Sequence, residues 1–358
     1  MTAGARPQRV LVIRNDRVGD LLLSMPAIRA VREAFPASHI TVLASPYNAP
    51  VLHGWSVPDR VVLYDCEWPL RHRWRVARDL ARQSYDLCLV LNQSLEAYVV
   101  ARLTGAPARV GLVIARRVLD RPFAPLLLTT RCFSRIEAAV ARGLPVPHEI
   151  ELTRLVLERA GIPWAGDELE VPLEPESLRW ADMLIARHFP AGAILAGVHL
   201  SPKWLDQGWT IDQVAAMLPM IAGARPEVGV VATYGPGDAG IAERLLATPA
   251  LRPVSDPAAS CRVATGWEGR VAVVPVDFPR WAATLARCRV VVSRSTGSLH
   301  LSSALKRPVV AVYAPTRFVE DSQQFAPWRV PSRILRGGPF DRVAPAIVQA
   351  VAELLNGT

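Results

Sequence analysis

Residues Arg9–Pro26 read RVLVIRNDRVGDLLLSMP, and this stretch decides how the fold begins. Arg9–Ile13 is a short apolar run rich in β-branched side chains, which predicts a buried strand. The run then breaks, and Gly19–Asp20 leads into a second apolar segment whose spacing is helical. We expect Pro26 in the first turn of this helix and Ser24 as its cap.

Asp20 is the residue of chemical interest in this stretch. It is expected in a strand-to-helix turn at the carboxyl end of a first strand, which is where open α/β sheets bind ligands. Two roles are open for its carboxylate: it caps the helix, or it acts as a catalytic base. Spacing alone favours the cap.

A second informative stretch, Arg289–Thr316, reads RVVVSRSTGSLHLSSALKRPVVAVYAPT. Val290–Val292 and Val309–Val312 are predicted strands, and Leu299–Leu305 is a predicted short helix. The polar turn Ser295–Ser298 lies between the first of these strands and the helix. Its backbone N–H groups and hydroxyls are expected at a helix N-terminus, where anions bind.

Together the two stretches resemble glycosyltransferase family 9, the ADP-heptose:lipopolysaccharide heptosyltransferases. Members begin with a strand, a polar loop, Gly-Asp and an apolar helix that contains a proline. Near the C-terminus they carry Asp-Thr-Gly, a nearby His, and a strand ending in Gly-Pro-Thr. The matching residues here are Gly19–Asp20, Thr296–Gly297, His300 and Ala314–Thr316. The likeness follows nearly the whole chain in order.

Length and composition fit a globular enzyme of two domains. The chain has 358 residues, of which 51% are hydrophobic, and no apolar run approaches the roughly 20 residues that span a bilayer. We expect neither a signal peptide nor a transit peptide, because residues 1–8 lack an apolar core. Five scattered cysteines without a CxxC pair predict reduced thiols in a cytoplasmic protein rather than disulfides or a zinc site.

The chain is basic, with a formal net charge of +9. The excess is mostly arginine, which suits planar recognition of phosphate and carboxylate groups. Nucleic acid is the least favoured partner, because no recognised nucleic-acid-binding module is present.

The first half of the chain alternates predicted strands and helices, which indicates βαβ units and a mostly parallel sheet. The predicted strands are Arg9–Ile13, Ile40–Ala44, Arg60–Tyr64, Asp86–Leu91 and Arg109–Gly111. Residues 112–147 are expected to be irregular, and Glu149–Ala160 to be helical. The proline-rich residues 161–175 are expected to link two domains.

A second α/β series follows. Its predicted strands are Ile194–His199, Val228–Thr233, Val271–Val274 and the two of the C-terminal stretch, and its predicted helices include Ser177–His188, Ile211–Ala222, Pro279–Ala286 and Val343–Leu355. We therefore divide the chain into domains 1–165 and 176–340, with a final helix in 341–358 that packs back across the hinge. The resemblance implies the α/β architecture called GT-B, two Rossmann-like domains facing across a cleft. A nicotinamide dehydrogenase is disfavoured, because no Gly-x-Gly-x-x-Gly follows the first strand.

The resemblance also implies a mechanism. Asp20 would be the base of an inverting single displacement, and this favours the base over the cap. No Asp-x-Asp motif is present, so we expect no metal and no cofactor beyond the nucleotide-sugar donor, for which ADP-heptose is favoured. The departing diphosphate would instead bind the helix N-terminus at Thr296–Gly297.

Further donor contacts are expected from loops that follow predicted strands. Ser201 could bond a phosphate oxygen and Lys203 could neutralise its charge, although a solvated loop lysine is the alternative. The predicted donor-binding residues are Ser201, Lys203, Gly235, Asp238, Ser295, Thr296, Gly297 and His300. His300 could equally be a packed, hydrogen-bonded core histidine.

Acceptor recognition is assigned to the N-terminal domain. Arg71, Arg75, Arg78 and Arg82 have the spacing of one helix face, which is either a solvated basic face or a site for an anionic partner. The family's acceptor is an anionic inner-core glycolipid, and the predicted acceptor-binding residues are Arg71, Arg75, Arg78, Arg117, Arg121 and His148. The same tryptophan-bearing surface could rest on the cytoplasmic face of an anionic inner membrane.

Two positions depart from the family pattern. Ser295 stands where members usually carry an aspartate before Thr-Gly, and Gln207 stands where a lysine usually precedes the tryptophan by two residues. Three hypotheses therefore remain: transfer of a heptose from an ADP-sugar to a lipopolysaccharide-type acceptor, transfer from a different nucleotide sugar, or a glycan-binding protein that has lost activity.

Overall fold

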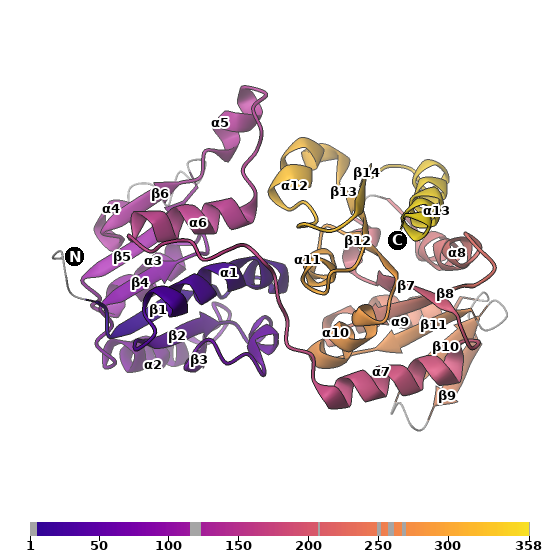
Figure 1. Cartoon of the computed structure of the whole chain (residues 1–358), viewed down its shortest axis with the longest axis horizontal. Helices are drawn as coiled ribbons and strands as arrows, with labels where there is room; N and C mark the ends of the chain where they lie inside the picture. Colours follow the sequence, from indigo (N-terminus) through magenta and orange to yellow (C-terminus); the bar gives the residue numbers. More distant parts are fainter. Residues whose placement is uncertain are drawn as a thin grey trace. The chain divides into compact units, whose positions relative to one another are not determined.

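The computed structural model describes residues 6–114, 123–206, 208–248, 252–256, 261–266 and 270–357. The chain divides into two compact units (Figure 1). The first is Met1–Pro172 with Gln323–Phe325, and the second is Leu173–Ser322 with Ala326–Thr358. In the part of the chain that is described, no helix is both long enough and apolar enough to span a membrane.

The first unit is built on a six-stranded sheet with the order β3-β2-β1-β4-β5-β6, and every pair of neighbours is parallel. The strands are β1 (Arg9–Ile13), β2 (His39–Ala44), β3 (Arg60–Leu63), β4 (Leu87–Val90), β5 (Ala108–Val113) and β6 (Thr130–Phe133). The chain moves outward from β1 to β3, and then from β4 to β6 on the other side. This order is the doubly wound Rossmann order, which places a ligand at the edge where β1 and β4 end.

Helices cover both faces of this sheet. They are α1 (Val18–Ala34), α2 (Leu70–Ala81), α3 (Leu95–Leu103), α4 (Ala124–Leu127), α5 (Ile136–Ala141) and α6 (Glu149–Arg159), with the 3₁₀ turn η1 (Ala49–Leu52). α1 packs against α6 and η1, whereas α2 packs against α3 and α3 against α4. Right-handed crossovers running in opposite directions from the middle of the sheet place these two groups on opposite faces.

The second unit has an eight-stranded sheet with the order β14-β13-β12-β7-β8-β11-β10-β9. Its strands are β7 (Ile194–His199), β8 (Val228–Tyr234), β9 (Arg252–Asp256), β10 (Cys261–Gly266), β11 (Val271–Pro275), β12 (Val290–Arg294), β13 (Val309–Tyr313) and β14 (Ser332–Arg336). The six strands from β14 to β11 are parallel, and β10 runs antiparallel to both of its neighbours. The parallel part repeats the strand order of the first unit.

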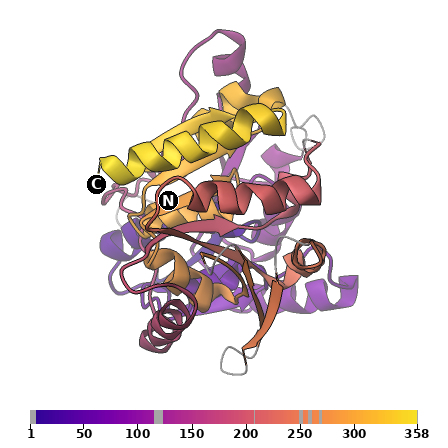
Figure 2. The ribbon, with the colours of Figure 1, turned by 90° about the vertical axis from the view of Figure 1, so that its right-hand side faces the viewer.

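The helices of the second unit pack on this sheet and on one another. They are α7 (Pro175–His188), α8 (Ile211–Ala222), α9 (Ala239–Leu246), α10 (Phe278–Ala286), α11 (Gly297–Ala304), α12 (Phe318–Gln324) and α13 (Phe340–Asn356), with the 3₁₀ turns η2 (Pro202–Trp204), η3 (Pro236–Asp238) and η4 (Pro315–Arg317). α13, drawn in yellow, lies beside α8 (Figure 2).

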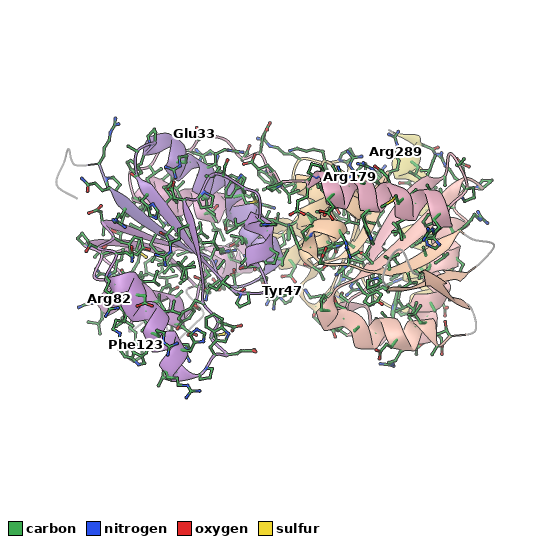
Figure 3. The ribbon with its side chains drawn as sticks, turned by 90° about the horizontal axis from the view of Figure 1, so that it is seen from below. Glu33, Tyr47, Arg82, Phe123, Arg179 and Arg289 are labelled. Carbon is green, nitrogen blue, oxygen red and sulfur yellow. The ribbon has the colours of Figure 1, made fainter. Side chains whose placement is uncertain are left out.

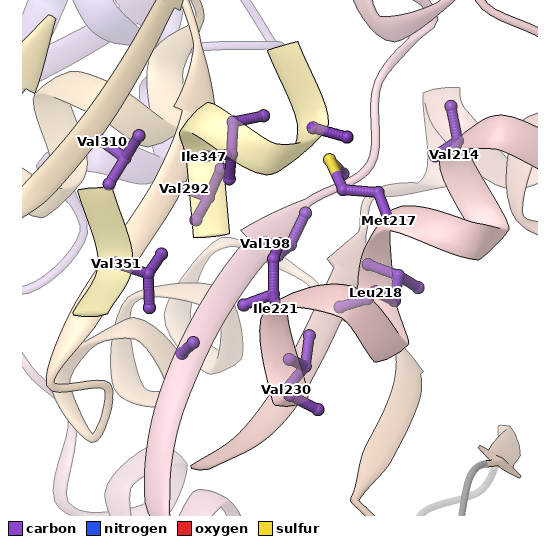
Figure 4. Close-up of a cluster of buried hydrophobic side chains, with 14 of the residues drawn as sticks. Val198, Val214, Met217, Leu218, Ile221, Val230, Val292, Val310, Ile347 and Val351 are labelled. Atoms are coloured by element: carbon purple, nitrogen blue, oxygen red, sulfur yellow. The ribbon is translucent and has the colours of Figure 1, made fainter. Parts of the chain in front are cut away.

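The buried face of α13 belongs to the core of the second unit. Ile347 and Val351 pack in one cluster with Val198, Val292 and Val310 of the sheet (Figure 4). Burying such side chains stabilises a fold by roughly 1.5–3 kcal/mol each, so α13 is an integral part of this unit. The predicted packing of the helix across the hinge stays a prediction.

The prediction for the start of α1 is wrong. The helix begins at Val18 with Arg17 as its N-cap, so Pro26 lies inside the helix and not in its first turn. Ser24 is therefore no cap, and its hydroxyl donates to the carbonyl of Asp20 at 2.8 Å. A proline costs an internal helix one hydrogen bond. The almost complete burial of the residues from Leu21 to Val31 offsets that cost.

The prediction that residues 112–147 are irregular is also wrong in part. Within its described residues, this stretch contains the end of β5, the short helices α4 and α5, and β6. β6 is only four residues long, and most of its side chains are partly or fully exposed, so no apolar run marks it. β14 was not predicted for the same reason, because its side chains are all at least partly exposed.

Candidate functional site

A cluster of charged side chains lies at the carboxyl end of β1. Arg14, the first residue after the strand, is only 2% exposed. Its guanidinium faces three carboxylates: Nη2 lies 2.8 Å from Glu149 Oε1 and 3.3 Å from Asp20 Oδ1, and Nε lies 3.3 Å from Asp16 Oδ1. Burial lowers the pKa of Arg14, but attraction to the three carboxylates and the hydrogen bond to Glu149 outweigh this effect and raise the pKa above its usual value, so Arg14 is charged at neutral pH.

Neighbouring loops hold the backbone of this cluster. Asn48, after β2, donates from Nδ2 to the carbonyl of Arg14 at 2.9 Å. Asn92, after β4, donates from Nδ2 to Asn15 Oδ1 at 2.8 Å. The guanidinium of Arg14 also donates to the carbonyl of Leu91. The ends of three adjacent strands therefore fix the loop that precedes α1, which is the preorganisation a catalytic group requires.

Asp20 lies in the first turn of α1 with its side chain 18% exposed. Because Arg17 occupies the N-cap position, the capping role that spacing alone favoured is wrong. Asp20 therefore lies near the positive end of the helix dipole of α1 and beside the buried cation of Arg14. It is a partly exposed carboxylate in a fixed position, and its role as the catalytic base stays a prediction.

Asp16 is held differently from Asp20. Its side chain is about a third exposed, but Oδ1 is buried against Arg14. Burial and the charge of Asp20 raise the pKa of Asp16 to about 6, against the lowering effect of Arg14. One guanidinium does not neutralise three carboxylates, and Asp16 is the group whose protonation relieves the excess negative charge.

His148 and Glu149 lie at the start of α6, which also contributes to this cluster. His148 is the N-cap of α6: its Nδ1 accepts from the backbone N–H of Ile150 at 3.2 Å, and Glu151 accepts from the backbone N–H of His148 at 2.8 Å. The next residue, Glu149, is the partner of Arg14. His148 is therefore placed beside the cluster with a structural function of its own, and its acceptor-binding role stays a prediction.

Three of the five predicted acceptor-binding arginines lie among the described residues. Arg71, Arg75 and Arg78 are exposed on α2, as their spacing predicted. Arg117 and Arg121 lie outside the described residues.

In the second unit, the turn between β12 and α11 forms the N-terminus of a helix. Thr296 is the N-cap of α11 but does not cap it through its side chain. Its hydroxyl is instead 2.7 Å from that of Ser298, which is 2.6 Å from that of Ser293. The first backbone N–H groups of α11 are thus not capped by the Thr296 side chain, and such groups bind anions.

A pocket of about 710 Å³ opens next to this turn, within the second unit. Lys203, Arg294 and Ser295 line it, together with Thr316 and Asp321. Lys203 Nζ donates to the carbonyl of Ser295, so the two predicted donor residues are in contact. The pocket therefore combines cationic side chains with a helix N-terminus, as recognition of a diphosphate requires.

The other predicted donor residues lie at the ends of β7 and β8. Ser201 is buried, and its hydroxyl has no hydrogen-bond partner among the described residues. Asp238 Oδ2 is 3.6 Å from Nε2 of His199, whose Nδ1 is 3.1 Å from the hydroxyl of Thr233. The backbone N–H of Asp238 donates to the carbonyl of Gly235 at 3.0 Å, which closes the turn after β8.

Two further features concern ions and thiols. Over the described residues, no group of three or more His, Cys, Asp or Glu side chains is arranged to hold a metal ion. Cys66, Cys88, Cys132 and Cys288 are free thiols, and burial raises the pKa of Cys132 to about 11. The side chain of Cys261 lies outside the described residues.

Comparison with known proteins shows similarity to one family. The family model described as glycosyltransferase family 9 (heptosyltransferase) matches residues 258–339. The chain is 23% identical to lipopolysaccharide heptosyltransferase 2 of Salmonella typhimurium over 326 residues. The aligned region covers 86% of this chain and 83% of that protein. The resemblance to glycosyltransferase family 9 is confirmed.

Solved structures give the same result for the fold. The glycosyl transferase family 9 structure from Veillonella parvula covers 98% of both chains with a TM-score of 0.75 at 18% identity. The structure of the Escherichia coli heptosyltransferase WaaC with ADP-2-deoxy-2-fluoro heptose covers 98% of this chain and 99% of that one, with a TM-score of 0.64 at 19% identity. The predicted α/β fold of GT-B type, with two Rossmann-like domains, is confirmed.

Set against the family 9 pattern, the site contains one residue that the sequence interpretation missed. Arg294, just before Ser295, is 4% exposed and lines the pocket. Its guanidinium lies 5.6 Å from the centre of the Trp204 ring, and its Nε has no hydrogen-bond partner among the described residues. Burial lowers the pKa of Arg294 to about 10, so it remains charged at neutral pH. The sequence feature that could have identified Arg294 is its position: it is a charged residue directly before Ser295, where the chain departs from the family 9 pattern.

The second departure from the family 9 pattern is Gln207, which stands where members usually carry a lysine. Gln207 lies outside the described residues. His300 is buried in α11, and its role in donor binding stays a prediction.

Proposed function

We propose that this protein is a family 9 heptosyltransferase that transfers a heptose from ADP-heptose to a lipopolysaccharide core acceptor. The similarity to lipopolysaccharide heptosyltransferase 2 over most of the chain supports this class of reaction. The observation that carries the proposal is Asp20, a partly exposed carboxylate held in the first turn of α1 beside Arg14.

In the proposed reaction, Asp20 accepts the proton of the acceptor hydroxyl as its oxygen attacks the anomeric carbon. The bond between that carbon and the diphosphate breaks, and the electron pair leaves with ADP. Attack opposite the leaving group inverts the anomeric centre. The N–H groups of α11, Lys203 and Arg294 would stabilise the charge that develops on the diphosphate, which is a role that a metal ion has in other transferases.

The acceptor would be an anionic glycolipid. Arg71, Arg75 and Arg78 supply exposed cations on α2 in the same unit as Asp20. Guanidinium groups bind phosphate and carboxylate through paired hydrogen bonds, so they suit an acceptor carrying such groups. A cytoplasmic location, at the membrane face where such acceptors are built, follows from this proposal.

Substitution of Asp20 tests the proposal. We expect D20N to lower the rate of heptose transfer by about 10²–10⁴-fold, because a positioned base contributes that much. Affinity for ADP should stay within about twofold, since the donor pocket is built in the second unit. The matched control is E33Q, which removes an exposed carboxylate from the same helix and should keep full activity. Unchanged transfer by D20N would remove Asp20 from the mechanism.

A second candidate keeps the reaction and changes the donor. Ser295 lines the pocket where family members usually carry an aspartate, and Gln207 stands where they usually carry a lysine, so two side chains expected near the donor differ from the family pattern. Calorimetric titration with ADP, UDP, GDP and CDP in the presence of EDTA separates the candidates. Selective ADP binding supports ADP-heptose, and selective binding of another nucleotide replaces the donor. Failure to bind any of them would favour a glycan-binding protein without activity.

A further inference from the structure

Three neighbouring helices of the first unit carry an unusual number of exposed apolar side chains. α2 packs against α3, and α3 against α4. Exposed large apolar side chains occur on each of the three. They are Leu70 and Trp74 on α2, Val99 and Leu103 on α3, and Phe123 and Leu126 at and within α4. We refer to the surface formed by these six residues as the α2–α3 face. A concentration of exposed apolar groups of this kind marks an interaction site.

A groove of about 410 Å³ runs along this face between α2 and α3. Leu70, Trp74, Val99 and Leu103 contribute to its apolar lining. Trp74 is 55% exposed, although tryptophan is among the most costly side chains to leave in water. The groove therefore offers a place for an apolar group that the protein itself does not fill.

The polar side chains within the groove satisfy one another. Glu96 Oε1 accepts from the hydroxyl of Tyr64 at 2.7 Å and lies 2.5 Å from Arg73 Nη2. Arg73 Nε in turn donates to the hydroxyl of Tyr64 at 3.3 Å. Because these groups are already paired, the groove presents mainly apolar surface to a ligand.

A row of arginines borders the groove on the outward side of α2. Arg71, Arg75, Arg78 and Arg82 recur at helical spacing, and all four are exposed. Arg82 Nη1 lies 3.3 Å from Asp79 Oδ1. α2 contains one carboxylate, Asp79, and α3 contains one, Glu96, so the arginines outnumber the acidic side chains on these two helices. The row rises roughly 16 Å along the helix, at about 1.5 Å per residue. Its length exceeds what a single phosphate or sugar carboxylate requires and suits an extended anionic surface.

We propose that the α2–α3 face docks on a bilayer rich in anionic phospholipid. The arginine row would contact the lipid phosphates, and the groove beside Trp74 would take the apolar part of a lipid at the bilayer surface. A basic helix with a tryptophan and leucines on its adjoining side has the composition of interfacial helices. Each arginine near an anionic leaflet contributes attraction that falls off within the Debye length.

The proposed docking shares Arg71, Arg75 and Arg78 with the proposed acceptor contact, but lipid binding is measured without any sugar donor, so the two proposals can fail separately. It also explains how a protein whose described helices include none that could cross a membrane would reach an acceptor embedded in one.

The test is flotation of the full chain with vesicles of phosphatidylglycerol and, separately, of phosphatidylcholine. We expect binding to phosphatidylglycerol vesicles that weakens as salt is added, and at least tenfold weaker binding to phosphatidylcholine. W74A should weaken binding to the anionic vesicles by about tenfold, through loss of its interfacial contact. R75Q combined with R78Q should weaken it by about 25-fold, and inorganic phosphate at millimolar concentration should not displace the vesicles.

Matched controls lie on the second unit. R179Q combined with R289Q removes two exposed arginines labelled in Figure 3, and M183A removes an exposed apolar side chain. Both should bind vesicles like the wild type. L70Q serves as a second apolar variant if W74A does not fold, as judged by its thermal unfolding. Equal binding to both vesicle types, or wild-type binding by W74A and L70Q, would overturn the proposal; displacement by free phosphate would identify a phosphate site instead.

Discussion

Three carboxylates face the guanidinium of Arg14, and their combined negative charge exceeds its single positive charge. With Asp16, Asp20 and Glu149 all ionised, these three carboxylates and Arg14 together carry a net charge of −2. Removing charge from water is costly even when ions are paired. The arrangement therefore lowers stability to keep a carboxylate in a fixed position, which is typical of functional sites.

The raised pKa of Asp16 makes this cost measurable. A folded-state pKa of about 6, against 3.8 for the ordinary group, means that the folded protein holds the proton more tightly than the unfolded chain. The contribution of Asp16 to stability then falls as the pH rises from about 4 to about 6 and is constant above that range. D16N should therefore raise stability at pH 7.5 by about 1 kcal/mol, a value reduced for the partial exposure of the side chain.

Denaturant unfolding of D16N and wild type at pH 7.5 and pH 4.5 checks this prediction. The gain should be present at the higher pH and shrink toward zero at the lower one, where Asp16 of the wild type is already protonated. Arg14 keeps Asp20 and Glu149 as partners in the variant. A loss of stability at pH 7.5 would show instead that Arg14 needs Asp16 as a partner.

Arg294 carries a second prediction. Its buried charge lacks a hydrogen-bond partner for Nε among the described residues, yet it lines the pocket beside Lys203. A bound diphosphate would supply the missing acceptor, and a hydrogen bond to a charged group contributes about 1.5–3 kcal/mol. R294Q should therefore weaken ADP binding by roughly 10- to 100-fold, as measured by calorimetry, without lowering the unfolding temperature of the ligand-free protein.

The control for this variant is R289Q, an exposed arginine of the same unit that should bind ADP normally. If R294Q bound ADP like the wild type but unfolded at a lower temperature, Arg294 would be a structural residue that packs on Trp204. Wild-type behaviour in both measurements would contradict both roles.

Local motifs and distant contacts differ in how well the sequence predicts them. Asp20 and Thr296–Gly297 could be singled out because each lies within a short strand–turn–helix pattern. The pair Arg14–Glu149 could not, because the two residues are 135 positions apart and only the packing of α6 against α1 brings them together. The burial of Arg294 likewise depends on Trp204, which comes from a different strand end.

Among the elements, the buried parallel strands were predictable; of the exposed edge strands, β3 was predicted from its apolar run, whereas β6 and β14 were not. The five residues of β12 are all buried, and their unbroken apolar start identifies the strand. β14 pairs with β13 at one edge of the sheet, where only one neighbour is needed and side chains can stay polar. α2 was predictable for a different reason, since its arginines and apolar residues separate cleanly at helical spacing.

For α1, local sequence rules predicted the wrong first residue of the helix. Proline favours the first turn of a helix, and Ser24 is a good capping residue, so the pattern placed the start too late. The helix extends to Val18 because Val18, Gly19 and Leu21–Leu23 are buried by the rest of the unit. This extension places Asp20 in the first helical turn, near the positive end of the helix dipole, and not in a loop.

The two units repeat one architecture and carry different parts of the proposed reaction. Both have the doubly wound strand order, and each has its own hydrophobic core. The proposed base, Asp20, lies near the end of β1 in the first unit, whereas the helix N-terminus and the pocket lined by Lys203 and Arg294 belong to the second. A ligand that binds only the second unit should therefore stabilise that unit first, because ligand binding shifts local unfolding where its contacts are made.

Hydrogen exchange read by mass spectrometry checks this prediction on the full chain. At about 100 times its Kd, ADP should slow exchange in peptides covering residues 289–316 by up to about 100-fold, which corresponds to about 2.7 kcal/mol. Peptides covering α2 and α3 should exchange as before, since their groove and arginine row are unconnected with the nucleotide. In R294Q the protection of 289–316 should shrink in proportion to the loss of affinity. Protection that appears first around β1 and α1 would place the nucleotide in the other unit and reverse the proposed division of labour between base and donor site.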